Sequence, residues 1–434
     1  MASPVPNTEV HSYDQILIDI VQYVYHTKID SPRAYERARI ALLDALGCAV
    51  ETLSVSPECV AMIGPTVPGT IVPNGFHLPG TSHVLDPIKG AFDMGAMIRY
   101  LDHNDAYPGA EWGHPSDNLG AILAIADWQS RTRAHDAASP HGISLHKLLT
   151  AHIKAYEIQG VFQIANAFNE HGLDHTILVK VASTAVTSYL LDLTEQQALA
   201  ALSQAWQWGF YHTMLRDKEI KIVRPYKSWV METVFFKLIP AEGHAISAAE
   251  AAVTVAQQLT ARGLSAEKHV KSVRIRTQKP AFTIVNKEGP LHNAADRDHC
   301  LQYIVAVIML KGTVIETADY MNESPWAQDP RVDLLREKMV VVEDEGFTRD
   351  YHDQKVRSGA NAILVELTNG EFLEDVVVEF PVGHPKSAET LPKVRAKFRE
   401  NMAYKFQSGE VDNILRAVES DDMPVHEFVD LFVR

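Results

Sequence analysis

The chain has 434 residues, of which 40 are basic and 55 acidic, and its formal net charge is −15. This length exceeds one ordinary hydrophobic core and predicts two domains, and a hydrophobic content of 46% is typical of a globular enzyme. The acidic balance argues against nucleic acid and anionic membranes as partners, because both select basic protein surfaces. An anionic ligand would therefore need a local cationic pocket.

The chain contains three cysteines, Cys48, Cys59 and Cys300, and none of them forms a C-x-x-C pair. They predict neither a disulfide framework nor an iron–sulfur cluster, which needs several closely spaced thiolates. No apolar run reaches the roughly 18 residues of a membrane span. Residues 1–20 contain no Lys or Arg, unlike a mitochondrial presequence. We therefore expect a cytoplasmic protein, with a mitochondrial location as the alternative.

Helical periodicity dominates the chain as far as residue 262. Ser31 followed by Pro32 predicts a helix start, because Ser caps the free backbone N–H groups and Pro suits the first helical position. Residues 57–87 are rich in Pro and Gly and predict an irregular connection. The helices expected in this part are 14–26, one that begins at 32, 91–99, 119–131, 144–159, 178–191, 195–206, 232–237 and 245–262.

The pattern changes after Gly263. Alternation over 270–277 and 338–343 predicts strands, and the runs 362–368 and 372–380 around Asn369-Gly370 predict a hairpin with a type I′ turn. One helix is expected at about 298–310, and residues 392–434 return to helix. The predicted fold is mainly α. It has a large helical domain (1–265), an inserted α+β lid domain (266–391) and a C-terminal helical return to the first domain (392–434).

The segment 100–120 holds an unusual density of ionisable groups between two apolar helices. They are Asp102, His103, Asp105, Glu111, His114 and Asp117. Burying such groups in a hydrophobic core is unfavourable, because each unpaired buried charge costs on the order of several kcal/mol. We interpret the segment as a structured loop for acid/base chemistry or polyanion binding, the alternative being a polar capping loop. No H-E-x-x-H or H-x-H pattern supports a metal site here.

Other polar positions fall at predicted helix starts. His175 and Lys180 lie at the beginning of the helix 178–191, where backbone N–H groups favour anions. His244 precedes another helix. The segment 293–303 adds a possible carboxylate ligand, Arg297, and possible proton donors at His299 and Tyr303. The alternative for each is a capping, solvated or core role.

Several stretches resemble the 2-methylcitrate dehydratases of the MmgE/PrpD family. They are residues 67–75 (VPGTIVPNG), 111–120 (EWGHPSDNLG), 174–184 (DHTILVKVAST), 295–303 (ADRDHCLQY) and 423–428 (MPVHEF). The resemblance implies a helical domain with an α+β lid, a homodimer, and a hydro-lyase that needs no iron–sulfur cluster, cofactor or metal. Its substrate would be 2-methylcitrate or a related alkylcitrate, a small tricarboxylate.

The resemblance also implies roles for individual residues. Asp102, His114, His175, His244 and Tyr303 would line the pocket. His114 and His175 would be base and acid in an unassigned order, Asp102 would orient an imidazole or hold a proton, and Tyr303 would assist. Further substrate contacts are expected from His103, Lys180, His244, Arg297 and His299.

One departure from the family pattern follows Trp206. The family has a further segment, with a lysine in a Lys-Ser-Trp-Ala motif, before the stretch that starts here at Trp208. Three hypotheses follow. The chain is an active dehydratase, a catalytically impaired homologue that acts as a dimer partner, or a decarboxylase or isomerase of a related acid. Lys218, Lys221 or Lys227 would be the candidates to replace the missing lysine.

Overall fold

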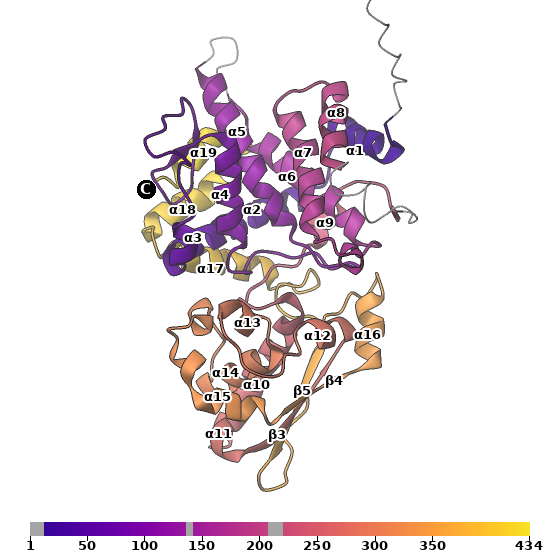
Figure 1. Ribbon diagram of the computed structural model, residues 1–434, viewed down its shortest axis with the longest axis vertical. Helices are drawn as coiled ribbons and strands as arrows, with labels where there is room; N and C mark the ends of the chain where they lie inside the picture. The colour runs from indigo at the N-terminus through magenta and orange to yellow at the C-terminus, as the bar shows by residue number, and fades with distance from the viewer. Residues whose placement is uncertain (1–12, 136–141, 207–219) are drawn as a thin grey trace, which may run out of the picture.

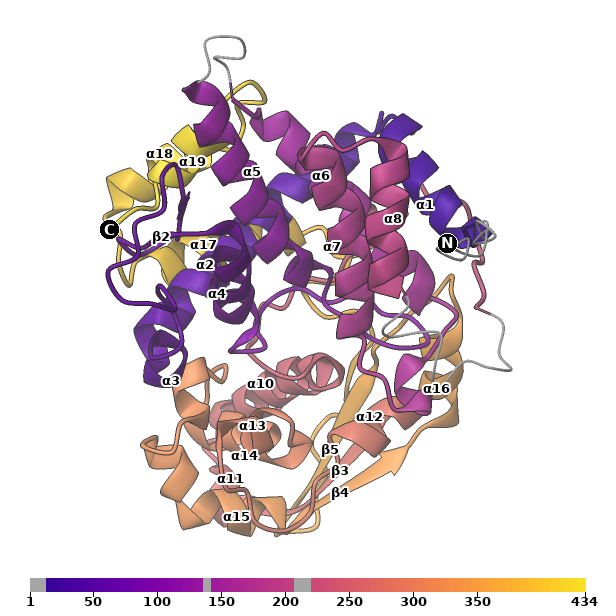
Figure 2. The same cartoon turned by 45° about the horizontal axis from the view of Figure 1, so that its top comes forward.

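The computed structural model describes residues 13–135, 142–206 and 220–434. In both views a helical region lies above an α+β region, and the C-terminal helices, in yellow, belong to the upper one (Figures 1 and 2). Two separate clusters of buried apolar side chains correspond to these regions. Among the described residues, no helix combines the length and apolar character that crossing a membrane requires.

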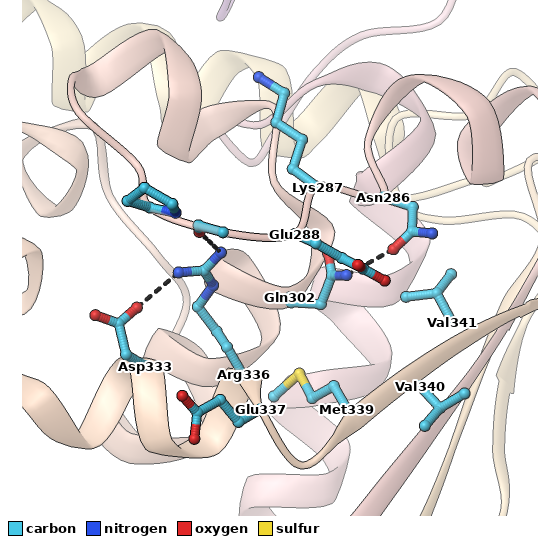
Figure 3. A pocket seen from close by; sticks show the side chains of 12 residues that line it. Asn286, Lys287, Glu288, Gln302, Asp333, Arg336, Glu337, Met339, Val340 and Val341 are labelled. Atoms are coloured by element: carbon cyan, nitrogen blue, oxygen red, sulfur yellow. Dashed lines mark hydrogen bonds and ion pairs between the residues drawn. The ribbon is translucent and has the colours of Figure 1, made fainter.

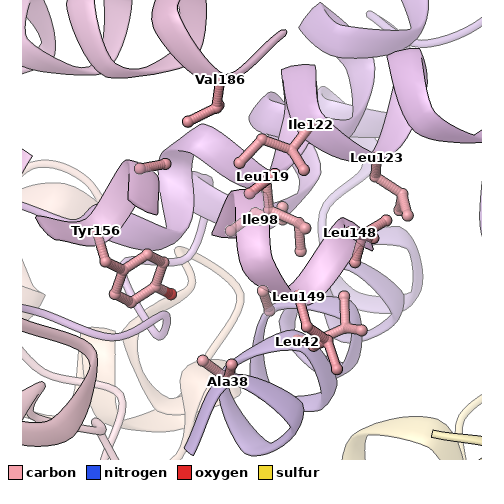
Figure 4. Packing of buried hydrophobic residues seen from close by; sticks show 14 of the residues in the cluster. Ala38, Leu42, Ile98, Leu119, Ile122, Leu123, Leu148, Leu149, Tyr156 and Val186 are labelled. Carbon is pink, nitrogen blue, oxygen red and sulfur yellow. The ribbon is translucent and has the colours of Figure 1, made fainter. Parts of the chain in front are cut away.

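The helical region is built around α2, whose residues are buried on almost every side. Ser31 accepts a hydrogen bond from the Ala34 N–H at 3.2 Å and Pro32 is the first helical residue, so the predicted start is confirmed. Side chains of α2, α4, α5, α6 and α7 meet in the core (Figure 4). The elements of this region are α1 Gln15–His26, α2 Pro32–Val55, α3 Pro57–Val60, β1 Phe76–His77, β2 Val84–Leu85, α4 Pro87–Arg99, α5 Leu119–Ala134, α6 Leu145–Gln163, α7 Thr176–Leu190, α8 Glu195–Trp206, α9 Trp229–Thr233, α17 Thr390–Met402, α18 Ser408–Ala417 and α19 Val425–Asp430.

The α+β region contains a sheet of strand order β4-β3-β5-β6. β3 pairs parallel with β4 and antiparallel with β5, and α10 packs on β5, β6 and α14. The elements are α10 Ile246–Ala261, α11 Ala266–His269, β3 Val270–Thr277, α12 Lys279–Ile284, α13 Ala294–Asp298, α14 Leu301–Lys311, α15 Pro330–Arg336, β4 Met339–Glu343, α16 Glu345–His352, β5 Asn361–Leu367 and β6 Val376–Val378.

Three details differ from the sequence predictions. The helix expected at 232–237 is α9, which begins earlier, at Trp229, and ends at Thr233, because the following residues pair with the loop through the Ala106–Phe235 bridge. The hairpin is present, but Asn369 does not adopt the positive φ that a type I′ turn requires. Instead the Gly370 N–H bonds to the Leu367 carbonyl, and Gly370 alone has a positive φ of 86°. The helix expected at 298–310 is divided into α13 and α14.

The boundary between the two cores lies earlier than the expected position at residue 265. The apolar side chains of α10, such as Ile246 and Val255, belong to the α+β core. They belong there because α10 covers the sheet, whereas the sequence pattern of α10 is that of any buried helix. At the other end, Val394 and Phe398 of α17 pack in the helical core.

Candidate active site

The loop between α4 and α5 brings Asp102 to the centre of a cationic cluster. Its carboxylate Oδ1 lies 2.7 Å from Lys237 Nζ and 2.5 Å from Arg99 Nη1, and 3.7 Å from His114 Nε2. Lys237 Nζ also donates to the Asp102 backbone carbonyl at 2.9 Å. The cluster therefore joins the end of α4, the loop and the segment after α9.

Electrostatics keep Asp102 ionised. Burial favours the neutral acid, but Lys237 and Arg99 hold the pKa of this carboxyl well below its usual range. The Asp102 carboxylate thus faces two basic side chains, Lys237 and Arg99. The Lys237 side chain is 1% exposed, whereas that of Arg99 is 35% exposed, so Arg99 is the cation that solvent reaches.

His114 is a neutral imidazole with a free acceptor nitrogen. Burial, together with the charges of Arg99 and Lys237, lowers its pKa well below the usual value. Its Nδ1 lies 2.6 Å from the Asp105 carbonyl oxygen, which only accepts, so Nδ1 carries the hydrogen. Nε2 then holds the lone pair on the side of Asp102.

His175 lies beside His114, at the start of α7. The ring centroids are 5.4 Å apart, and the buried Nε2 of His175 has no hydrogen-bond partner. Its Nδ1 is 3.4 Å from an oxygen of Asp174. Burial lowers the pKa of His175, and Asp174 opposes this effect. The structure thus brings Asp102, His114 and His175 together, although the last comes from a segment distant in sequence.

The α+β region contributes further polar groups near this cluster. His299 Nδ1 is 2.6 Å from Asp298 Oδ1, and the Asp102 charge acts on both residues. Burial lowers the pKa of His299, but Asp298 outweighs it and the net shift is upward. Tyr320 is fully buried, feels the charges of Asp298 and Asp102, and has no partner for its hydroxyl.

His244 is held in an aromatic setting at the same side. Its Nδ1 lies 2.8 Å from Glu242 Oε1 and its Nε2 3.0 Å from the Tyr351 hydroxyl, and its ring contacts Trp112. Burial raises the pKa of Glu242, but His244 and Lys237 lower it by more, so the net shift is downward. Because the charge of Lys237 acts on Glu242, the Glu242–His244 pair lies close to the Asp102 cluster.

Three predicted residues are placed differently. Tyr303 lies in the α+β core, 3% exposed, and its hydroxyl donates to the Asp319 carbonyl at 2.8 Å, so the structure gives it a packing position rather than a free proton. Arg297 Nη1 donates to the Tyr320 carbonyl at 2.7 Å and thereby fixes the backbone beside Tyr320. Lys180 is on the exposed side of α7, which matches the solvated alternative.

His103 belongs to a second buried cluster. Its Nδ1 lies 2.8 Å from Glu51 Oε2, and Glu51 also accepts from Thr317 of the α+β region at 2.7 Å. Among the described residues, Cys48, Glu51 and His103 are the group that could offer metal ligands, with their atoms within 4.8 Å of one another. The charge of the Lys397 ammonium acts on all three residues, so a positive charge is already present there. This donor set does not fit a metal cation.

Other acids of the loop have raised pKa values. Burial raises the pKa of Glu111 and of Asp117 to about 7, and that of Asp105 to about 6. Asp105 accepts from the Tyr156 hydroxyl at 2.6 Å, and Glu111 accepts from the Phe168 N–H at 2.7 Å. These acids shape the loop, which explains how a short buried segment tolerates so many of them.

Sequence reasoning did not find Lys237 or Tyr320. Lys237 was detectable as a lysine inside the apolar run 234–239, because a buried ammonium needs a partner. Tyr320 had no local signal, since it occupies a short connection after α14.

A separate pocket of about 580 Å³ lies in the α+β region, lined by residues such as Arg336, Gln302 and Met339 (Figure 3). Arg336 bridges Asp333 and the Gly289 carbonyl there. None of the predicted site residues lines this pocket.

Comparisons with known proteins show the family of this chain. Residues 18–227 match the MmgE/PrpD N-terminal domain and residues 239–423 the MmgE/PrpD C-terminal domain. The chain belongs to the MmgE/PrpD family. Its relatives include the 2-methylcitrate dehydratase-like protein oryR of Aspergillus oryzae, which is 50% identical over 97% of this chain and 96% of its own length. The alkylcitrate dehydratase phiI of a fungal species is 44% identical over 97% and 94%, and the 2-methylcitrate dehydratase of Escherichia coli is 43% identical over 97% and 98%.

The alignments also bear on the segment that the sequence predicts to be missing after Trp206. They extend over 475 to 478 positions in these three relatives, more than the 434 residues present here, so each contains gaps in this chain. That the missing residues follow Trp206 stays a prediction, and Lys218 lies outside the described residues. Of the other two candidate replacements, Lys221 is exposed, and the ammonium of Lys227 lies over the Trp229 ring.

Proposed function

We propose that this protein is a hydro-lyase that removes water from 2-methylcitrate or a related alkylcitrate. The arrangement of Asp102, Lys237, His114 and His175 carries the proposal, and the names of the relatives support it. An elimination of this kind needs a base for a weakly acidic C–H, a proton for the leaving hydroxyl, and cations for the carboxylates.

His114 is the proposed base. Its Nε2 lone pair takes the proton from a carbon next to a carboxylate, the C–H electron pair becomes the new C=C bond, and the hydroxyl leaves the adjacent carbon. Asp102 stabilises the imidazolium that forms, because its negative charge lies 3.7 Å from that nitrogen.

His175 is the proposed acid. Burial lowers its pKa in the free protein, and a bound tricarboxylate would raise this pKa and favour the imidazolium form. It then gives its proton to the departing hydroxyl, which leaves as water. Arg99 and Lys237 supply the positive charge for the substrate carboxylates, and His244 and His299 are proposed as further contacts.

The second candidate is an impaired homologue that acts as a dimer partner. The predicted loss of the family lysine after Trp206 favours it, and the alignments with the relatives contain gaps in this chain. We further propose a homodimer in the cytoplasm. Light scattering of the purified protein and a fluorescent fusion would test these two proposals.

The deciding experiment follows the ultraviolet absorbance of the new conjugated double bond with 2-methylcitrate as substrate. We expect turnover by the wild type and a loss of about 100-fold or more in kcat/KM for His114→Ala, the usual scale for a general base. His292→Ala, at an exposed histidine, is the matched control and should keep wild-type activity. Absence of turnover in folded wild-type protein, with a longer alkylcitrate also tested, would favour the impaired homologue.

A further inference from the structure

Asp102 has an unusual backbone conformation. Its φ is +50°, in the left-handed region that non-glycine residues rarely adopt. Such a residue keeps this conformation only when its surroundings determine it, and it recurs at functional sites. The groups that hold the backbone around Asp102 are therefore part of how the site is built.

Two buried lysines hold successive carbonyl groups of this turn. Lys237 donates to the carbonyl of Asp102 at 2.9 Å, and Lys397 donates to the carbonyl of His103 at 2.7 Å. Lys397 belongs to α17, in the C-terminal helical return, and its side chain is 7% exposed.

Lys397 also binds the segment that carries Lys237, the cation of the Asp102–Lys237 ion pair. Its ammonium donates to the backbone carbonyl of Lys237 at 2.8 Å and to Asp44 Oδ1 at 2.8 Å. The three hydrogens of the ammonium thus have three acceptors, and none remains for a ligand. One side chain fixes the turn that carries Asp102 and the segment that carries Lys237.

We propose that Lys397 is a positioning residue that sets the Asp102–Lys237 pair by binding the backbone on both sides of it. This inference rests on the proposed function as far as turnover is concerned. Asp44 provides the compensating charge. Lys397 does not touch the reacting atoms in this scheme.

The test compares Lys397→Met with Lys393→Met, a variant of an exposed lysine on the same helix that pairs with Glu389. We expect kcat to fall by about 100-fold in the Lys397 variant, the scale of a small misplacement of catalytic groups, with KM changed much less. The acidic limb of the pH–rate profile should move to higher pH, because Asp102 loses the fixed contact with Lys237. A merely destabilising substitution would lower the active fraction and leave this profile in place.

Amide hydrogen exchange provides a readout that does not need turnover. We expect faster exchange in peptides covering 100–106 and 234–239 of Lys397→Met and unchanged exchange in α6. Should this variant not fold, the double variant Asp44→Leu/Lys397→Met removes both buried charges together, which is often neutral for stability. The double variant should show the same shift of the pH–rate profile and the same faster amide exchange.

The outcomes separate the two proposals. A folded Lys397 variant with the exchange and pH profile of Lys393→Met would overturn the positioning role. If the wild type converts no alkylcitrate, the proposed function fails, while the exchange comparison still decides the role of Lys397.

Discussion

The buried pair between Lys237 and Asp102 offers a quantitative test of the site. Replacing Lys237 by Met keeps the volume of the side chain but leaves the Asp102 carboxylate with Arg99 and His114 as its remaining partners. Breaking a buried pair on one side typically costs 3–5 kcal/mol, and the surviving Arg99 contact places this case at about 3 kcal/mol. The loss would appear as a lower midpoint in urea unfolding.

A double-mutant cycle isolates the interaction. Asp102→Asn alone leaves the Lys237 ammonium buried without its charge partner, whereas the double variant removes both charges. We expect the double variant to be more stable than either single one, so the coupling free energy should exceed the cost of each single substitution.

Lys271 provides the matched control. Its ammonium lies 2.7 Å from Glu366, the same separation as in the Lys237 pair, but its side chain is 58% exposed. Water and salt screen such a pair, so Lys271→Met should unfold at the wild-type midpoint. Equal midpoints for the Lys237 and Lys271 variants would refute the reasoning, because burial would then not distinguish the two pairs.

Two further predictions concern pH and the two tyrosines. The pKa of Glu111 is raised to about 7 in the folded protein, above its value of about 4.3 in the unfolded chain, so the stability it contributes is present below about pH 4.3 and is lost as pH rises through 7. Glu111→Gln should flatten the decline of the unfolding free energy between these pH values, and an unchanged slope would contradict the assigned burial effect. Tyr303→Phe should cost about 1 kcal/mol of stability, for one lost hydrogen bond, with little change in kcat. Tyr320→Phe should instead lower kcat, since its hydroxyl is unpartnered near Asp102, and the reverse order in an activity assay would restore Tyr303 as the catalytic candidate.

Much of the secondary structure could be predicted because its causes are local. α8 and β3 begin and end at the predicted residues, and α1 and α2 begin at or next to them. Apolar spacing, Ser-Pro at a helix start and strict alternation act over a few residues, so the sequence alone contains them. The hairpin turn differed because the φ of Asn369 depends on how the two strands are paired around it.

The candidate site could be located by its density of acids and imidazoles, but its members could not be separated. Asp102 and His103 are adjacent in sequence, yet one meets Lys237 and the other meets Glu51. The left-handed turn at Asp102 separates them, and long-range contacts hold that turn.

What the sequence determined by itself was the mainly helical fold, the family resemblance and the loop that carries the ionisable groups. The tertiary structure decided which of these groups lie together. Lys237 reaches Asp102 across 135 residues, and Lys397 reaches His103 across 294. The sequence could not foresee such pairings, because a buried charge takes whichever partner the packed core brings within hydrogen-bond distance, and separation along the chain does not limit that choice.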